Sequence, residues 1–246
     1  MPHKASRSVS GFPPRGIKAI FFDAGATLIH PDPPVEEVYA REFSEWRIRF
    51  SPQELSGALT RAWEEVHAEK MADRYGGVRG EPGFWKTFLN RVRGRLDGGT
   101  VSPEVFARLS AHFADPSSWV IYEDVTETLE SLDRMGFLLA VVSNWDSQLP
   151  RLLERLGLSA HFRAVSVSAI ERIGKPDPEI FRRTCARLGV PAREALHVGD
   201  SVLEDFEGAR GAGLAALLLD REDRFPDRPL RVRSLRELPS RLGAPE

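Results

Sequence analysis

The sequence predicts an α/β protein in which helices cover a parallel sheet, with a separate all-helical unit near the start of the chain. Over most of the chain, short apolar runs alternate with helical segments, a rhythm typical of parallel sheets. Between about 33 and 116 only helical spacing of apolar residues remains. With 246 residues, 41% of them hydrophobic, the chain can bury one large core or two small ones.

Five short apolar runs predict the strands of the sheet, and helical segments fill the intervals between them. The expected strands are 17–22, 137–142, 164–167, 196–198 and 215–219. Three of the helical segments end at a glycine, a common residue just after a helix C-terminus. These glycines are Gly136, Gly157 and Gly189.

The all-helical unit is predicted from four stretches with apolar residues at helical spacing. They cover 35–50, 52–75, 82–96 and 102–114. The flanking stretches "HPDPP" and "ADPSS" are rich in proline and polar residues, as linkers between domains tend to be. We therefore expect a flexible tail of 1–16, a sheet domain formed by 17–30 and 119–246, and a helical domain of 31–118.

Composition excludes several classes of partner. The formal net charge is −2 and the basic residues are scattered, so neither nucleic acid nor an anionic membrane is expected as a partner. The single cysteine, Cys185, excludes an intramolecular disulfide. Because no apolar run reaches transmembrane length and the first 16 residues lack a signal-peptide core, we expect a cytoplasmic protein. The sequence does not fix the oligomeric state.

Polar side chains follow three of the predicted strands, at the sheet edge where α/β proteins bind ligands. One strand ends in a carboxylate, one in a hydroxyl with an amide, and one in a carboxylate with a second nearby. These residues are Asp23, Ser143, Asn144, Asp200 and Asp205. Converging carboxylates repel one another, so the pattern predicts a hard divalent cation, with Mg²⁺ and a substrate phosphate as the best match.

Lys175, in "GKPDP", follows the expected strand 164–167 and would supply the positive charge opposite Asp23 and a phosphate. Only five of the 34 lysines and arginines are lysines, so its use here indicates a preference for a compact point charge. The hydroxyls of Ser143 and Thr27 could hold phosphoryl oxygens, or Thr27 could satisfy its own loop. An aspartate nucleophile that forms an aspartyl-phosphate is established chemistry.

Four segments, "DAGATL", "VVSN", "GKPDP" and "HVGDSVLED", occur in this order and resemble the four motifs of the haloacid dehalogenase (HAD) superfamily. The helical block falls where one class of that superfamily inserts its cap. The resemblance implies a Rossmann-like core of 17–30 and 119–246, with helices on both faces of the sheet, and a helical cap of 31–118.

The same resemblance implies a role for each matching residue. Asp23 would be the nucleophile, with Ser143 and Lys175 stabilising the phosphate and its charge. Asp200 would bind magnesium, and Asp205 would support the metal through water. Apart from the resemblance, the place of Asn144 at a strand end predicts that it either binds phosphate and positions its neighbours or only satisfies backbone groups there.

The chain departs from the HAD phosphatase pattern at Gly25, two residues after Asp23, where those enzymes carry a second aspartate. The family uses the backbone carbonyl of this position as a metal ligand, so Gly25 keeps that capacity. It lacks the side-chain acid/base, a contribution worth roughly 10²- to 10⁴-fold in rate. We therefore expect a slow, magnesium-dependent phosphatase of a small phosphorylated compound, favouring good leaving groups such as aryl or acyl phosphates.

Two alternative functions stay open. Haloacid dehalogenases also lack the second aspartate, although the acidic pair in "GDSVLED" suits a metal that carbon–halogen displacement does not need. The second alternative is a weakly catalytic or silent family member that binds a phosphorylated ligand or a protein. Gly25 is the main support for this alternative. Trp145 is expected to line the crevice or to cover the core, and Asp124 to cap the helix that follows it.

Overall fold

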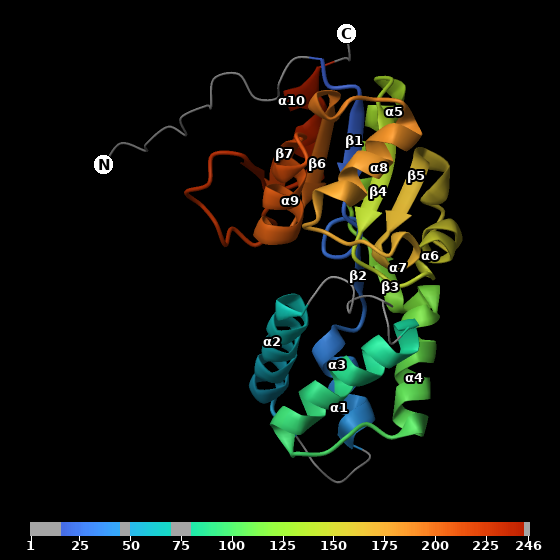
Figure 1. Cartoon of the computed structure of the whole chain (residues 1–246), viewed down its shortest axis with the longest axis vertical. Coiled ribbons are helices and arrows are strands. Elements are labelled where there is room, and N and C mark those ends of the chain that lie inside the picture. The colour runs from blue at the N-terminus through green and yellow to red at the C-terminus, as the bar shows by residue number, and fades with distance from the viewer. Residues whose placement is uncertain (1–15, 45–49, 70–79, 244–246) are drawn as a thin grey trace.

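The computed structural model describes residues 16–44, 50–69 and 80–243, so nearly all of the tail expected at 1–16 lies outside the described residues. The molecule has a sheet-containing part and a helical part, stacked along its long axis (Figure 1). Among the described residues, no helix combines the length and apolarity needed to cross a membrane.

The sheet has six parallel strands in the order β5-β4-β1-β6-β7-β8. Their bounds are β1 Ala19–Phe22, β4 Leu138–Ser143, β5 Phe162–Val167, β6 Ala195–Gly199, β7 Ala215–Leu219 and β8 Arg231–Val232. All five expected strands are confirmed, with small differences at their ends. β1 pairs with β4 on one side and β6 on the other, so Asp23, at its end, lies at the centre of the sheet edge.

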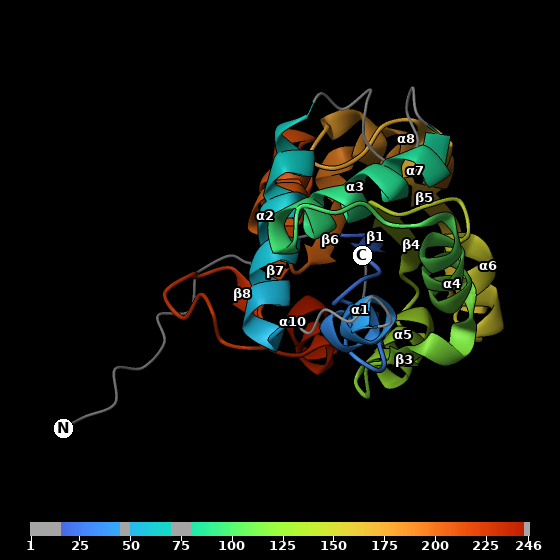
Figure 2. The same ribbon diagram turned by 90° about the horizontal axis from the view of Figure 1, so that it is seen from below.

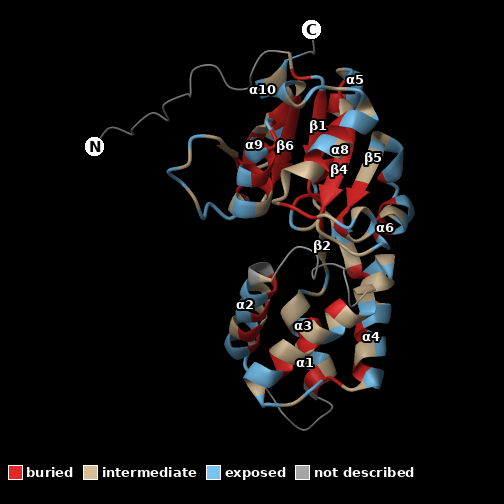
Figure 3. Ribbon diagram, viewed as in Figure 1, coloured by how far each residue is buried: buried red, intermediate tan, exposed pale blue. Residues whose placement is uncertain are grey.

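Helices cover both faces of this sheet, as the α/β prediction requires. The central strands are buried (Figure 3). Successive side chains of β1 point to opposite faces, so Ile20 and Phe22 join one apolar cluster while Ala19 and Phe21 join another. The first cluster includes apolar side chains from α5 Val125–Arg134, α6 Leu149–Arg155 and α10 Leu238–Leu242. The second cluster includes apolar side chains from α8 Pro178–Leu188 and α9 Gly208–Gly211. A short helix, α7 Ser168–Glu171, follows β5.

Among the described residues, four helices form the second part: α1 Val35–Ser44, α2 Pro52–Ala68, α3 Gly80–Leu96 and α4 Pro103–Ala114. They bury their own apolar cluster, which includes Val38, Leu55 and Phe84. Serines cap two of them, and a proline follows each serine: Ser51 forms a capping box with Glu54, and the Ser102 side chain accepts from the Val105 amide. The strands point toward these helices, which lie across the strand ends as a cap (Figures 1 and 2).

The two connections between the parts form a ribbon that the sequence pattern does not predict. β2 Ile29–Pro31 and β3 Trp119–Ile121 pair antiparallel, with His30 opposite Val120. Each strand has only three residues, too few to show a period-two pattern. The ribbon spans the two points, 30/31 and 118/119, at which the sheet domain is expected to join the helical domain. The domain boundaries themselves stay a prediction.

Asp124 lies at the N-cap position of α5, as expected, but its side chain does not cap the helix. Its side chain makes no capping hydrogen bond; instead it accepts two from the Arg221 guanidinium, both at 2.9 Å, one from Ser234 Oγ at 2.6 Å and one from the Leu235 amide at 2.8 Å. Arg221 also donates to the carbonyl oxygen of Thr27 at 2.9 Å. The C-terminal segment is thereby fastened to the start of α5 and to the loop that follows β1, because donors from distant segments outcompete the local cap.

Candidate active site

Asp23 is held in place directly after β1. Its amide donates to the carbonyl oxygen of Val198 at 3.0 Å, which extends the β1–β6 pairing by one residue. Its carboxylate oxygen Oδ1 accepts from Ser143 Oγ at 2.8 Å and from Lys175 Nζ at 2.7 Å. Within the described part of the chain, no group donates to Oδ2. One oxygen of Asp23 is therefore fixed, and the other is left for a ligand or an electrophile.

Lys175 is 1% exposed and bridges two carboxylates. Nζ donates to Asp205 Oδ1 at 2.5 Å as well as to Asp23. The side-chain amide of Asn144 holds the Lys175 backbone at both polar atoms, donating to its carbonyl oxygen at 2.9 Å and accepting from its amide at 2.8 Å. These contacts favour the positioning role for Asn144, and its contact with phosphate stays a prediction.

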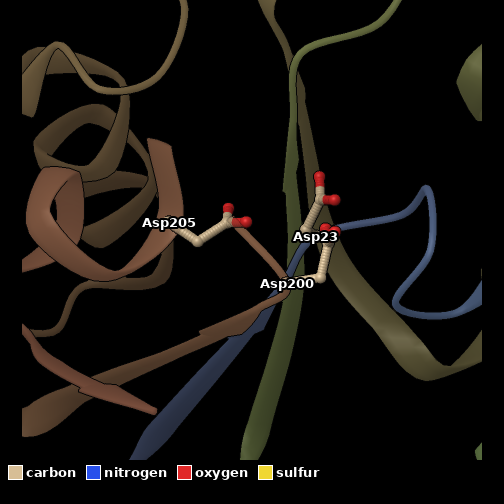
Figure 4. Close-up of side chains that lie close together, drawn as sticks. All are labelled: Asp23, Asp200 and Asp205. Carbon is tan, nitrogen blue, oxygen red and sulfur yellow. The ribbon is translucent and has the colours of Figure 1, made fainter. Parts of the chain in front are cut away.

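Three carboxylates converge at the sheet edge. Asp23, Asp200 and Asp205 each have an oxygen within 4.8 Å of the others, although they come from the ends of β1 and β6 and from the segment beyond β6 (Figure 4). Asp200 is half-buried, with Arg224 3.8 Å from its Oδ2. Asp205 is buried and fully engaged: Oδ1 accepts from Lys175 and from His197 Nε2 at 2.8 Å, and Oδ2 accepts from the Ser201 amide at 2.9 Å.

Backbone geometry after β6 allows Asp205 to reach this position. The segment Val202–Glu207 is a π-helical turn, a rare form that is frequent at functional sites. It folds the Asp205 side chain back over Gly199, where a Cβ atom would lie 2.2 Å from Asp205 Cγ. Only glycine at 199 permits this approach.

Burial and charge shift the pKa values of the carboxylates in different directions. Burial raises the pKa of Asp23, although Lys175 opposes the rise. Burial, with repulsion from Asp23 and Asp205, raises the pKa of Asp200 to about 7. Burial would also raise the pKa of Asp205, but Lys175 and His197 outweigh it and hold that pKa below its usual range. Asp205 is therefore the permanent anion of the group, whereas Asp23 and Asp200 both gain a proton more easily than an ordinary aspartate.

Lys175 and His197 complete the charge distribution. Burial would lower the pKa of Lys175, but Asp205 and Asp23 raise it above its ordinary value, so the amine stays charged. Burial lowers the pKa of His197. We assign the proton of the neutral imidazole to Nε2, because its carboxylate partner only accepts. With all three carboxylates ionised, one ammonium faces three negative charges, which leaves a net charge suited to a divalent cation.

The donor set fits magnesium. The carboxylates of Asp23 and of the half-buried Asp200 offer hard oxygen ligands, and no described backbone amide donates to the Gly25 carbonyl. Asp205, whose two oxygens are already engaged, is placed to support the site through Lys175 rather than as an open ligand. The residues expected to bind metal are thus brought together, and their ligand roles stay predictions.

Thr27 and Gly25 lie in the loop between β1 and β2. Thr27 is fully buried, and its hydroxyl has no hydrogen-bond partner among the described residues. Such an unpaired group is costly, and a bound ligand would satisfy it. A Cβ atom at Gly25 would lie 3.0 Å from Cζ3 of Trp145. The indole thus occupies the space into which a side chain at position 25 would point.

Three residues of the site were not anticipated from the sequence. His197 is a polar residue inside an apolar strand, which was the available signal. Gly199 and Ser168 gave none, because their roles depend on close contact with Asp205 and with the backbone of Trp145. The helical cap contacts the loop after β4, which carries Trp145, through Glu81 of α3. The Glu81 carboxylate accepts from the Ser147 amide at 3.0 Å and from Ser147 Oγ at 2.9 Å.

Fold and site together define the class: a Rossmann-like α/β protein with a helical cap and an acidic, lysine-containing centre at the carboxyl edge of its sheet. Residues 17–213 match the model of the haloacid dehalogenase-like hydrolase family. The chain belongs to that family of hydrolases.

Individual relatives agree with this assignment. The chain is 30% identical over 238 residues to haloacid dehalogenase-like hydrolase domain-containing protein 3 of Danio rerio, covering 92% of this chain and 96% of that protein. It is 32% identical over 208 residues to a glyceraldehyde 3-phosphate phosphatase of Methanopyrus kandleri, covering 83% and 84%. The crystal structure of a HAD phosphatase from Thermococcus onnurineus superposes with a TM-score of 0.65 at 28% identity, covering 93% of this chain and 99% of that one.

Gly199→Ala tests the close approach of Asp205. The added methyl group would collide with the Asp205 carboxyl, so we expect the free energy of unfolding to fall by about 1–3 kcal/mol, as overpacking typically costs. Urea unfolding at pH 7 measures this change. Gly94→Ala in α3 is the control: no atom lies within 4 Å of its Cβ position, and we expect its stability to hold or rise. Equal stability of the two variants would contradict the geometry.

Proposed function

We propose that the protein is a magnesium-dependent phosphohydrolase that acts on a small phosphorylated compound through an aspartyl-phosphate on Asp23. One observation carries the proposal: Ser143 and Lys175 hold one carboxylate oxygen of Asp23, while the other is free of hydrogen bonds from described groups. That arrangement fixes the nucleophile's orientation without blocking its attacking atom. Cytoplasmic location and the absence of a nucleic-acid partner stay predictions from the sequence.

The reaction would take place in two displacements at phosphorus. Asp23 Oδ2 attacks the substrate phosphorus, the bond from phosphorus to the leaving oxygen breaks, and that oxygen departs with the bonding electrons. Water then attacks the phosphorus of the aspartyl-phosphate, which releases inorganic phosphate and restores the carboxylate. Lys175 supplies fixed positive charge beside the transferred group, and the unpaired Thr27 hydroxyl is available to its oxygens. Ser143 would have to turn its single O–H from Asp23 Oδ1 to the phosphate to contact it.

Magnesium would be held by Asp23, by Asp200 and by the Gly25 carbonyl, with Asp205 supporting the site. The ion would supply charge neutralisation of the phosphate and of the converging carboxylates. The family relationship and the acidic cluster support this assignment.

The absence of an acid/base side chain at position 25 limits the substrates. Without a proton donor, the leaving oxygen departs as an anion, so stable anions leave fastest. We therefore infer a slow enzyme that favours good leaving groups such as aryl or acyl phosphates. A phosphatase named for glyceraldehyde 3-phosphate among the relatives supports phosphomonoester chemistry in general.

A binding role without turnover is the second candidate, favoured by the indole that fills the space beside Gly25. Against it is the charge arrangement: a buried lysine between two carboxylates is costly to assemble, and ligand binding alone does not require a nucleophile.

Turnover of p-nitrophenyl phosphate and acetyl phosphate tests the proposed function. We expect activity with magnesium and none with chelator, and Asp23→Asn should lower kcat by more than about 10³-fold because the nucleophile is lost. Alkyl phosphates should be hydrolysed more slowly than aryl phosphates. Halide release from 2-chloropropionate in the presence of chelator would indicate a dehalogenase. Binding of phosphate analogues without any turnover would favour the binding role.

Magnesium affinity should depend on pH through Asp200. Its pKa of about 7 lies above the unfolded value of roughly 3.9, so the fold favours the protonated form, and the stability gained this way is lost as pH rises through 7. Magnesium needs the ionised carboxylate, so its affinity should rise about fivefold from pH 6 to pH 7 and about twofold from pH 7 to pH 8.

Calorimetric titration with Mg²⁺ at pH 6, 7 and 8 measures this dependence. Asp200→Asn should melt at a higher temperature than the wild type at pH 8 without metal and should lose the magnesium-dependent rise in Tm. Glu130→Gln, an exposed change on α5, is the control. Affinity that is constant across this pH range would contradict the assignment of Asp200.

Restoring an acid/base at position 25 should require space as well as a carboxylate. In Gly25→Asp the new Cβ meets Trp145, whereas Gly25→Asp with Trp145→Ala has room for the side chain. We expect the double variant to hydrolyse 2-glycerophosphate roughly 10²- to 10⁴-fold faster than Trp145→Ala alone, with a smaller gain for Gly25→Asp alone. Steady-state kinetics measure kcat, and equal rates for the double variant and Trp145→Ala would exclude a missing acid/base as the limit on rate.

A further inference from the structure

Trp145 is fixed at the junction of core and cap. Its amide donates to Ser168 Oγ at 3.0 Å, and its carbonyl oxygen accepts from the same hydroxyl at 3.1 Å and from the Ala169 amide at 3.3 Å. Ser168 is buried, and its hydroxyl links the loop after β4 to the start of α7. The backbone of Trp145 is therefore tied down at both of its polar atoms.

The indole meets the loop that carries Asp23. Its Cζ3 lies 3.0 Å, and its Cε3 and Cη2 both 3.9 Å, from the position of a Cβ at Gly25. All three atoms belong to the six-membered ring of the indole, so an aromatic edge replaces a side chain two residues from the nucleophile. The ring therefore lies beside the loop from which Asp23 would attack phosphorus.

Other aromatic side chains continue from Trp145 into the cap. The Trp119 ring lies 4.9 Å from Trp145 between centroids and is tilted by 53°, and Phe113 lies 6.1 Å from Trp119. Trp145 and Phe113 also line a cavity of about 210 Å³ between α4 and α6, together with Leu152, Gln148 and others. The charged side chains of Asp146, Arg151 and Arg155 also line this cavity, and no residue of the acidic centre does.

We propose that Trp145 is a specificity-determining residue whose indole receives an aromatic leaving group. This inference rests on the proposed function and narrows its substrates from good leaving groups in general to aryl phosphates. An aromatic ring gains from ring–ring geometry with the indole beyond what its buried area supplies, and an aliphatic ring of similar size does not.

Binding of two non-hydrolysable phosphonates tests the proposal on the full chain with magnesium. Phenylphosphonate and cyclohexylphosphonate are similar in size and differ in aromaticity. Calorimetry should show that the wild type binds phenylphosphonate about two- to tenfold more tightly. Trp145→Leu should bring the ratio to about one, and Trp145→Phe should retain part of the preference. The wild-type comparison needs no variant, so a loss of fold in Trp145→Leu does not prevent the test.

The outcomes separate this inference from the proposed function. Equal affinity of the wild type for both phosphonates, a preference that survives Trp145→Leu, or binding of neither overturns the role of Trp145. Hydrolysis of p-nitrophenyl phosphate in the first two cases leaves the phosphatase standing. A preference for phenylphosphonate that depends on Trp145, without turnover of any phosphate, supports the aromatic site and overturns the phosphatase.

Discussion

The buried ammonium group of Lys175 is the interaction on which the rest of the site depends. Taking an ammonium out of water costs several kcal/mol, and only well-placed counter-charges offset that cost. Asp23 and Asp205 provide them at 2.7 and 2.5 Å, one from the end of β1 and the other from the turn after β6. Removal of either carboxylate would leave a buried charge poorly compensated. The motifs are thus coupled physically as well as by their order in the sequence.

A layer of uncharged contacts holds this ion cluster in register. Asn144 fastens the backbone of Lys175, Gly199 makes room for Asp205, and His197 donates to Asp205 while remaining neutral. None of these contacts adds charge, so they orient the cluster without altering its balance. Asp23 then has one oxygen immobilised and one available, and Asp200 is left as the acidic group whose protonation responds to conditions near neutrality.

The sequence predicts the central sheet well because its strands are long enough for apolar runs to be distinctive. It misses β2, β3 and β8, which have two or three residues and are defined by pairing with distant partners. The charged residues of the site were predictable because parallel strands deliver their ends to one edge. Their supports were not: Asp124 binds Arg221, 97 residues away, and Asn144 binds Lys175, 31 residues away. Such contacts follow from the folded geometry, and local sequence patterns do not predict contacts between residues so far apart in the chain.

Gly25 and Trp145 are best understood as one feature. A Cβ at position 25 would lie 3.0 Å from the indole, so a side chain there requires the ring to shift, whereas glycine leaves the tryptophan in place. Loss of an acid/base lowers the rate most for substrates whose leaving oxygen needs a proton. It matters least for aryl esters, whose leaving anion is delocalised, and these are the substrates that an aromatic wall can recognise. The exchange of a proton donor for an aromatic surface would therefore shift selectivity toward aryl phosphates while the charged centre around Lys175 stays unchanged.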